Sequence, residues 1–398
     1  MTTQADHWLT KDRLKIYPRI FLFIYAVAIC YWLFMASGNF DMRGHPLGTD
    51  FTSFYAASSL VLQGNPHLAY DFSSHFAAEK AAVGEQLNLY YSFSYPPTFL
   101  LLLAPFAKLP YLLALALWLS MTLLFFIAMV RKLANEKETI ILLLAFPAVF
   151  LTIGHGQNAF LSAGLIAGGL YYLDRKPLLA GLLIGLLSFK PHLGILIPFV
   201  LILSGHWKVF ISAAITTLLF ASVSWLAFGD ETWNAFFEST VNTQNTLNNG
   251  IVGLYKMQSL FASLRNNGVG LTGAYLLHGG LALCASAAIV WVWLQDVDKH
   301  MKYAALCTAS LLISPFLLDY DLTILAIPIA CLVRYGISNG FRPHLLNILC
   351  LAWVAPLIVR ILNLYINIPW MPILLSTLLY QIVMVCRKKL PEQKEIND

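Results

Sequence analysis

The stretch YLLALALWLSMTLLFFIAMV, residues Tyr111 to Val130, contains no charged residue. A helix rises about 1.5 Å per residue, so a run of about 20 apolar residues crosses the roughly 30 Å hydrocarbon core of a bilayer. Arg131 and Lys132 follow directly, and basic residues beside a membrane span are typical of the cytoplasmic side. This stretch therefore predicts a transmembrane helix whose C-terminal end is cytoplasmic.

The whole chain has the same character. Of its 398 residues, 59% are hydrophobic and only 11% are charged, whereas about 25% are charged in ordinary soluble domains. The mean hydropathy is +0.69, and long apolar runs recur, so we expect an all-α polytopic membrane protein surrounded by lipid bilayer. The basic residues lie in short clusters between apolar runs, which indicates topology signals and no nucleic-acid partner. The six cysteines contain no C-x-x-C pair, so we expect neither a disulfide framework nor a metal site, and no cofactor.

The loop charges alternate along the chain and predict about twelve spans with both termini in the cytoplasm. The first span covers about residues 18–35 and follows three basic residues, and the last ends at the basic residues 387–389. Two long polar loops, 37–95 and 229–269, are then periplasmic, and the tail 387–398 is cytoplasmic. The sequence contains no internal repeat, so we expect a single integral membrane domain over the whole of residues 1–398.

Two apolar runs matter for the count of spans. The run after Tyr95-Pro96-Pro97 extends only to Pro105, and about nine residues cannot cross the hydrocarbon core as a helix. It is predicted to be a re-entrant or interfacial segment. The run from Ile140 to Ile153 is predicted to be one span that leads outward.

Short amphipathic helices are expected in the first outer loop. Aromatic and aliphatic residues follow Asp50 at helical spacing, and Gly64 supplies a stop. Asp50 is predicted to be the N-cap, where a carboxylate accepts backbone N–H bonds and is stabilised by the helix dipole. Asp71 is predicted to cap a second helix that ends near Ala82. A helix cap alone would explain Asp50; a catalytic carboxylate facing water is the alternative.

In this topology the polar groups that composition does not explain gather at the outer ends of the spans. They are Asp50, His155, Gln157, Asn158, Lys190, Gln258, Arg265, Asp319 and Asp321. Ionisable groups at membrane depth are costly and are usually paired or functional. The acids and the two cations could form a structural ion-pair network. Alternatively, one acid could be a catalytic carboxylate, with the cations beside it binding a phosphate. For His155, a hydrogen-bonded turn histidine is favoured over a ligand or an acid.

Seven short motifs carry a resemblance that covers roughly residues 45–330. They are, in order, Gly48-Thr49-Asp50-Phe51, Tyr95-Pro96-Pro97, Gly156-Gln157-Asn158, Ala180-Gly181-Leu182-Leu183, Lys190-Pro191, Met257-Gln258-Ser259 and Ser314-Pro315. With this order and spacing the chain resembles the family 87 glycosyltransferases. These are polytopic enzymes of the GT-C superfamily and include α-mannosyltransferases that use polyprenol phosphate mannose.

The resemblance implies a GT-C-like helical bundle that transfers a hexose, in particular mannose, from a polyprenyl phosphate-linked donor to a glycolipid or glycan acceptor. It implies inversion, an active site on the periplasmic side of a bacterial inner membrane, and Asp50 as the catalytic base. Lys190 and Arg265 are the expected ligands of the donor phosphate, without a metal. The expected substrate-binding residues are His155, Gln157, Asn158, Gln258, Asp319 and Asp321. Some members carry a histidine after the late Ser-Pro motif, where this chain has Asp319-Tyr320-Asp321.

Two other classes of protein compete with this interpretation. A secondary transporter or a flippase of lipid-linked sugar would also have about twelve spans, but it predicts polar residues near mid-span and repeat symmetry. A non-catalytic assembly subunit could keep the fold without the activity. Such a subunit would not need the acid or the cations.

Overall fold

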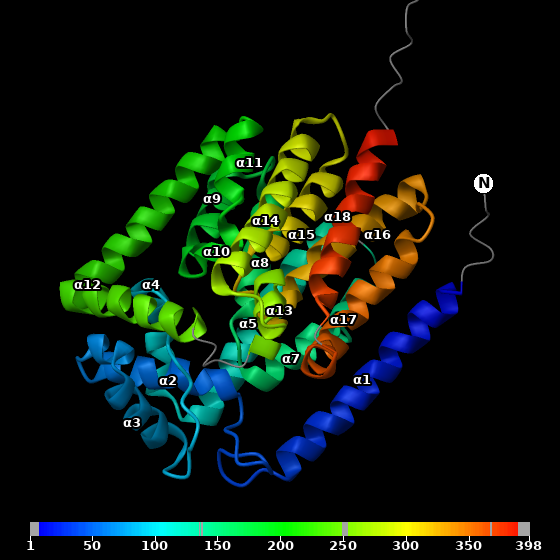
Figure 1. The fold of residues 1–398 in the computed structure, drawn as a ribbon. Helices are drawn as coiled ribbons and strands as arrows, with labels where there is room; N and C mark the ends of the chain where they lie inside the picture. Colours follow the sequence, from blue (N-terminus) through cyan, green and yellow to red (C-terminus); the bar gives the residue numbers. More distant parts are fainter. Residues whose placement is uncertain (1–7, 135, 137, 249–253, 367, 389–398) are drawn as a thin grey trace, which may run out of the picture. The chain divides into compact units, whose positions relative to one another are not determined.

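The computed structural model describes residues 8–134, 136, 138–248, 254–366 and 368–388. In this part of the chain the secondary structure is helical, and strand pairing is limited to isolated bridges (Figure 1). The chain divides into two compact units: unit 1 comprises Met1–Lys132, Lys137–Pro191 and Lys208–Gly253, and unit 2 comprises Leu133–Glu136, His192–Trp207 and Leu254–Asp398. An all-α fold is confirmed.

Unit 1 holds the N-terminal half of the chain together with one long later helix. Its elements are α1 (Lys11–Phe34), α2 (Thr49–Leu62), η2 (Pro66–Tyr70), α3 (Phe72–Val83), α4 (Pro97–Leu103), η3 (Ala104–Lys108), α5 (Tyr111–Ala134), α6 (Thr139–Leu144), α7 (Pro147–His155), α8 (Ala159–Tyr172), α9 (Pro177–Leu186), η4 (Leu187–Phe189) and α12 (Trp207–Asn248). The helices α2 and α3 and the residues between them lie in the predicted outer loop 37–95.

Unit 2 holds the C-terminal part of the chain and a short insertion from its middle. Its elements are α10 (Pro191–Gly194), α11 (Ile197–Leu203), η5 (Leu254–Lys256), α13 (Leu260–Asn266), α14 (Leu271–Leu294), α15 (Lys299–Ile313), η6 (Asp319–Leu325), α16 (Ala326–Asn339), α17 (Leu345–Tyr365) and α18 (Trp370–Lys388). Within this unit α15 packs against α14, α16 and α18 and is almost completely buried.

Seven helices are long and apolar enough to cross a membrane, counting only the described residues. They lie at Asp12–Phe34, Tyr111–Ala134, Trp207–Asn242, Leu271–Leu294, Asp319–Asn339, Leu345–Tyr365 and Trp370–Arg387. Shorter apolar helices lie at Pro97–Lys108, Ala159–Tyr172, Pro177–Phe189 and Pro191–Leu203. The chain is therefore a multi-pass helical membrane protein, but the predicted count of about twelve spans is not confirmed.

The structure differs from the predicted spans where proline interrupts an apolar run. The predicted span 140–153 is broken into α6 and α7, because Pro147 starts a new helix at its first position and proline has no N–H to continue the preceding one. The short run after Pro96, by contrast, was predicted not to span, and it forms α4 and η3, each too short to cross the hydrocarbon core.

The second predicted outer loop, 229–269, begins as helix. Here α12 continues to Asn248 across a kink at Gly229, whose φ of 76° and ψ of 174° are open to glycine. Residues 249–253 of this loop lie outside the described residues, as do residues 1–7 and residues 389–398 of the predicted cytoplasmic tail.

Two glycines let α9 lie directly on α12 within unit 1. A Cβ atom added to Gly181 would stand 2.4 Å from the Cβ of Ser212, and one added to Gly185 would stand 2.5 Å from the Cβ of Thr216. The Ser212 hydroxyl also donates to the Leu178 carbonyl at 2.9 Å. Small residues four apart are the usual means of close helix packing in membranes, so this spacing sets the approach of the two helices.

We expect Gly181→Leu to lower the thermal stability of the purified protein. The added side chain has to push α12 away, and overpacking of this kind costs about 1–3 kcal/mol. The matched control is Gly279→Leu, since a Cβ at that helical glycine of α14 meets no atom within 4 Å. The unfolding midpoint in detergent measures both, and an equal midpoint for the two variants would contradict the packing role.

Candidate active site

Asp50 lies in the first turn of α2 and does not cap the helix. The N-cap is Gly48, which has φ 70° and forms no side-chain cap bond, so the prediction that Asp50 caps the helix was wrong. A Cβ at Gly48 would stand 2.7 Å from the side chain of Leu115. Both the positive φ and the lack of room for a side chain therefore favour glycine here. The half-buried Asp50 carboxylate is therefore not used to hold the helix end. The prediction for Asp71 is confirmed, since its carboxylate accepts from the N–H of Ser74 at 2.9 Å and begins α3.

A series of hydrogen bonds joins Asp50 to three other residues that the sequence singled out. The Gln157 side-chain amide donates to the Asp50 carboxylate at 3.0 Å. The Gln157 side-chain oxygen Oε1 accepts from the N–H of Asn158 at 2.9 Å and from the Tyr95 hydroxyl at 3.3 Å. The Lys190 ammonium donates to the Asn158 side-chain oxygen at 3.0 Å. A carboxylate and a cation far apart in the sequence thus belong to one polar cluster in unit 1.

The turn after α7 positions Gln157 beside Asp50. Gly156 ends α7 with φ 65°, and a Cβ there would stand 2.6 Å from the Cβ of Phe51 and 3.2 Å from the Cα of Gly48. The backbone of the turn therefore lies against the first turn of α2, where any larger residue would collide. This contact brings the side chain that follows Gly156 to the Asp50 carboxylate.

The cluster is largely withdrawn from solvent. Lys190 is 4% exposed, Gln157 is 3% exposed and Asn158 is fully buried. The side-chain nitrogen of Asn158 has no hydrogen-bond partner among the described residues, although buried donors are usually satisfied. Attraction between charges is stronger in such surroundings than in water, so the buried ammonium and the Asn158 N–H are groups of the kind that suit an anion.

Aromatic packing supports α2 beneath the cluster. Phe54 packs edge-to-face on Tyr95 at 5.4 Å and on Phe99 at 5.2 Å, measured between ring centroids. The buried Tyr111 hydroxyl donates to the Leu47 carbonyl at 2.6 Å, just before the helix begins. Such edge-to-face ring pairs favour one particular arrangement in addition to burying apolar area, so they hold α2 in a defined position.

His155 ends α7, and its Nδ1 lies 2.9 Å from the Thr49 hydroxyl. This contact agrees with the hydrogen-bonded turn histidine that the sequence favoured. A role for His155 in binding substrate stays a prediction.

The other predicted site residues belong to unit 2. Gln258 is fixed by its backbone N–H, which donates to the Leu317 carbonyl at 2.7 Å, and by its side-chain oxygen, which accepts from Asn363 at 3.0 Å. Arg265 lies in the last turn of α13, and its guanidinium donates to the Val269 carbonyl at 3.0 Å. The parts of Gln258 in substrate binding and of Arg265 in donor binding stay predictions.

Asp319 and Asp321 are both buried at the start of η6. Asp319 forms an ion pair with Arg360 of α17 at 3.3 Å, and the Asp321 carboxylate accepts from the N–H of Leu318 at 3.3 Å. The guanidinium of Arg360 also lies 5.9 Å from the centre of the Tyr255 ring. Asp319 is therefore paired in unit 2 with a cation other than the two that the sequence singled out, and substrate binding by the two acids stays a prediction. Sequence reasoning missed Arg360, although a cation near the end of the predicted span 345–362 was a signal.

The family model described as Glycosyltransferase family 87 matches residues 93–315, more than half of the chain. The chain belongs to glycosyltransferase family 87. No curated protein matches it, and no solved structure does. The matched region holds Gln157, Asn158 and Lys190; Asp50 precedes the region, and Asp319 follows it. This family 87 member is thus a membrane glycosyltransferase.

A buried acid and a buried histidine lie on α3 of unit 1, and sequence reasoning missed both. Glu79 and His75, one helical turn apart on α3, are fully buried, with His75 Nδ1 3.8 Å from a Glu79 oxygen. Both Glu79 oxygens accept from the N–H of Tyr91, at 3.2 and 3.3 Å, and His75 Nε2 lies 3.2 Å from the Ser53 carbonyl. The spacing of four residues between a histidine and a glutamate was the signal.

Burial favours the neutral form of both groups. Burial raises the pKa of Glu79 to about 8, and the negative charge of Asp50 adds to this effect. Burial lowers the pKa of His75 to about 4. The pair ties the Tyr91 segment to α2 without placing a second charge beside Asp50.

These pKa values predict how stability depends on pH. The unfolded chain releases the Glu79 proton at its ordinary pKa of 4.5, whereas the folded protein keeps it up to about pH 8, so this group makes stability fall as the pH rises between those values. His75 has the opposite effect only between about pH 4 and its ordinary pKa of 6.5. Between pH 6.5 and 8 the effect of Glu79 therefore acts without that of His75.

We expect Glu79→Gln to remove this loss of stability between pH 6.5 and 8. The loss in the unaltered protein is at most about 1.4 kcal/mol per pH unit. Unfolding midpoints at the two pH values measure it, with Glu85→Gln as the control because Glu85 is exposed in the same loop. If the midpoint of Glu79→Gln fell as far as that of the unaltered protein, Glu79 would not be protonated at neutral pH.

Proposed function

We propose that this family 87 glycosyltransferase moves a hexose, mannose in particular, from a polyprenyl phosphate donor to a glycolipid or glycan acceptor. We place the reaction on the periplasmic side of a bacterial inner membrane, with both chain termini in the cytoplasm. The observation that carries the proposal is the polar series from the Asp50 carboxylate through Gln157 and Asn158 to the buried Lys190 ammonium. It supplies a base and a cation within one cluster.

In the proposed reaction Asp50 takes the proton from the acceptor hydroxyl, and the hydroxyl oxygen attacks the first carbon of the sugar. The bond between that carbon and the phosphate oxygen breaks as the new glycosidic bond forms. The electron pair leaves with the polyprenyl phosphate, and the configuration at the sugar carbon inverts, so a β-linked donor gives an α-linked product. The Gln157 amide holds one Asp50 oxygen, and the other oxygen receives the proton.

Lys190 stabilises the charge that develops on the leaving phosphate, since a buried ammonium is an effective partner for an anion. Because a phosphate monoester is already an adequate leaving group beside a cation, we propose that transfer does not depend on a metal ion. The unsatisfied Asn158 nitrogen beside Lys190 supplies a further donor to the phosphate oxygens.

The direct test is an assay of the purified protein in lipid nanodiscs. Polyprenyl phosphate carrying radiolabelled mannose or glucose is incubated with the protein and total membrane lipid, and the label is followed into new products. We expect transfer from the mannose donor. If no donor supports transfer while the protein moves labelled lipid across the bilayer, the flippase interpretation is favoured.

We expect Asp50→Asn to reduce transfer more than about 100-fold, because a positioned base contributes about 10²–10⁴-fold. Donor binding should be nearly unchanged. The matched control is Asp71→Asn in the same loop, since asparagine caps a helix as well as aspartate and Asp71 is an exposed cap. Transfer by Asp50→Asn at more than about a tenth of the unaltered rate would rule out Asp50 as the base.

We expect Lys190→Met to raise the donor KM about 10- to 100-fold, because a charge-assisted hydrogen bond contributes about 1.5–3 kcal/mol. Methionine keeps most of the length of the side chain and loses the charge. Lys108→Ala removes an exposed cation at the end of η3 and should leave the donor KM unchanged. Steady-state kinetics with varied donor measure both variants, and an unchanged donor KM in Lys190→Met would exclude a donor-phosphate role.

A further inference from the structure

The long helix α12 bends at Gly229, and a hollow of about 410 Å³ lies at the bend. Figure 1 shows the two arms of the helix meeting there at a sharp angle. Side chains of both arms line the hollow, among them Ser222, Trp225, Asp230, Trp233, Asn234 and Phe237. Its volume is within the usual range for small-ligand sites, so the bend can hold the polar end of a ligand.

The bend marks the end of a membrane span. The apolar helix that begins at Trp207 is 36 residues long, whereas about 20 residues are enough to cross the hydrocarbon core. The second arm is therefore left beyond the core, and contacts within unit 1 fix it to the predicted outer loop. The ring of Phe236 lies 5.8 Å from that of Tyr70, measured between centroids, and the Glu231 carboxylate lies 3.5 Å from His67 Nε2. The hollow is thus at the level of the lipid headgroups.

An exposed apolar stripe leads along the first arm to the hollow. Ile211, Ile215 and Leu218 are all exposed. Together with Ser222 and Trp225 they recur every three or four residues, so they share one face of the helix. An acyl chain can lie along such a stripe, and this favours a membrane lipid over a soluble ligand.

The charge of the hollow is negative. Asp230 is the one charged residue of its lining, and the sequence contains no lysine or arginine between Lys208 and Lys256. Asp230 is exposed, and its Oδ1 accepts from the indole N–H of Trp225. Because a carboxylate has about four acceptor positions, Asp230 can also accept from a ligand, and its charge favours a cationic one.

Aromatic rings surround this acid. Trp225, Trp233 and Phe237 all line the hollow, and the rings of Trp233 and Phe237 lie 5.9 Å apart between centroids. Tryptophan is the strongest partner for a cation over a ring face, and aromatic groups of this kind recognise organic ammonium ions. Tryptophan is also enriched at the headgroup level of membranes. The lining therefore suits the ammonium of a lipid headgroup.

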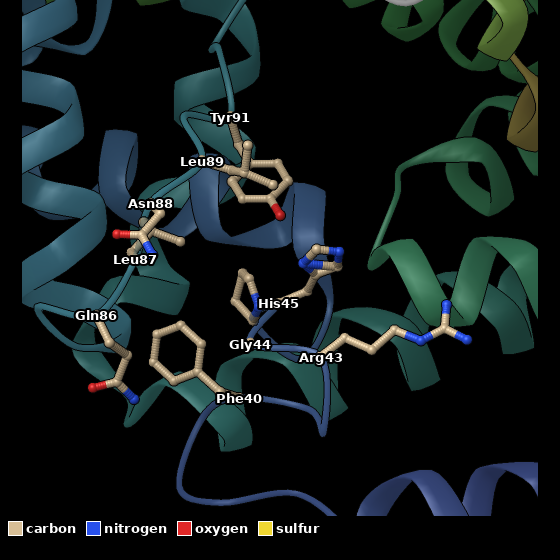
Figure 2. A pocket seen from close by; sticks show the side chains of 10 residues that line it. Phe40, Arg43, Gly44, His45, Gln86, Leu87, Asn88, Leu89 and Tyr91 are labelled. Atoms are coloured by element: carbon tan, nitrogen blue, oxygen red, sulfur yellow. The ribbon is translucent and has the colours of Figure 1, made fainter.

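Another pocket of unit 1 contrasts with the hollow in charge. It measures about 370 Å³, lies between the segments 40–46 and 86–91, and is lined by Arg43 and His45 without an acid. Figure 2 shows the Arg43 side chain extending away from Leu89 and Tyr91, so its guanidinium does not face the second wall. Of these two spaces, the bend of α12 alone suits a cation.

We propose that the bend of α12 binds a phospholipid with a primary ammonium headgroup, phosphatidylethanolamine. The ammonium donates to the Asp230 carboxylate and lies against Trp225, while an acyl chain follows the stripe that ends at Leu218. Lipids whose headgroup is only anionic, including a polyprenyl phosphate, are disfavoured there, because Asp230 repels them. The site is separate from the proposed transfer reaction and does not depend on it.

Native mass spectrometry of the purified full-length protein tests this lipid site. The protein is mixed with equal amounts of phosphatidylethanolamine and phosphatidylglycerol that carry the same acyl chains. We expect about tenfold more bound phosphatidylethanolamine, the difference expected for one charge-assisted hydrogen bond. Asp230→Asn should lose this preference, although asparagine keeps an oxygen for the Trp225 indole. The matched control is Glu238→Gln, because Glu238 is an exposed acid of the same arm that does not line the hollow.

A second variant and a second measurement keep the test independent of folding defects. Trp225→Leu keeps the acid and removes a ring that is 47% exposed, and it should weaken the preference as well. Added phosphatidylethanolamine should raise the unfolding midpoint of the unaltered protein and of Glu238→Gln, but not that of Asp230→Asn.

Equal binding of the two lipids by the unaltered protein would overturn the site, as would an unchanged preference in both Asp230→Asn and Trp225→Leu. Soluble phosphoethanolamine distinguishes the headgroup from the whole lipid. If it displaced the bound lipid at an equal concentration, the acyl stripe would have no part in binding, and a lipid would no longer be the occupant.

Discussion

The candidate site depends on the close approach of the Gly156 turn to the first turn of α2. Two glycines with positive φ, Gly48 and Gly156, meet there, and each leaves out a side chain that would force the segments apart. The approach brings the Gln157 amide to the Asp50 carboxylate. Hydrogen bonds through Asn158 then link Gln157 to Lys190. Because each glycine loses more backbone freedom on folding than another residue would, the aromatic packing under α2 has to offset that cost.

The sequence predicted those features that local patterns determine. Apolar runs and loop charges indicated a multi-pass all-α protein, and the spacing of apolar residues after Asp50 indicated α2. The cap of α3 at Asp71 followed from one residue type at one position. The seven motifs indicated family 87, which the match over residues 93–315 confirms. Each of these features depends on residues close together in the chain or on short motifs in a fixed order.

The features that the sequence did not predict depend on contacts between distant segments. Nothing near Glu79 in the sequence shows that it becomes fully buried, since its burial comes from the packing of α3 against α2. The pairing of Arg360 with Asp319 joins residues 41 positions apart. The predicted count of about twelve spans is not confirmed for a different reason: hydropathy does not show where proline divides an apolar run into helices too short to cross a bilayer, as at Pro147.

The error over the helix cap bears on the chemistry. A capping aspartate uses its carboxylate oxygens to satisfy backbone N–H groups at the helix start. With Gly48 in that position, which costs only a few tenths of a kcal/mol relative to a side-chain cap, the carboxylate of Asp50 points instead to the Gln157 amide. The same glycine gives α7 room to end against α2. Glycine at position 48 thus leaves the Asp50 carboxylate free of a capping role, and it lets the turn that carries Gln157 pack against α2. We therefore regard Gly48 as part of the candidate site.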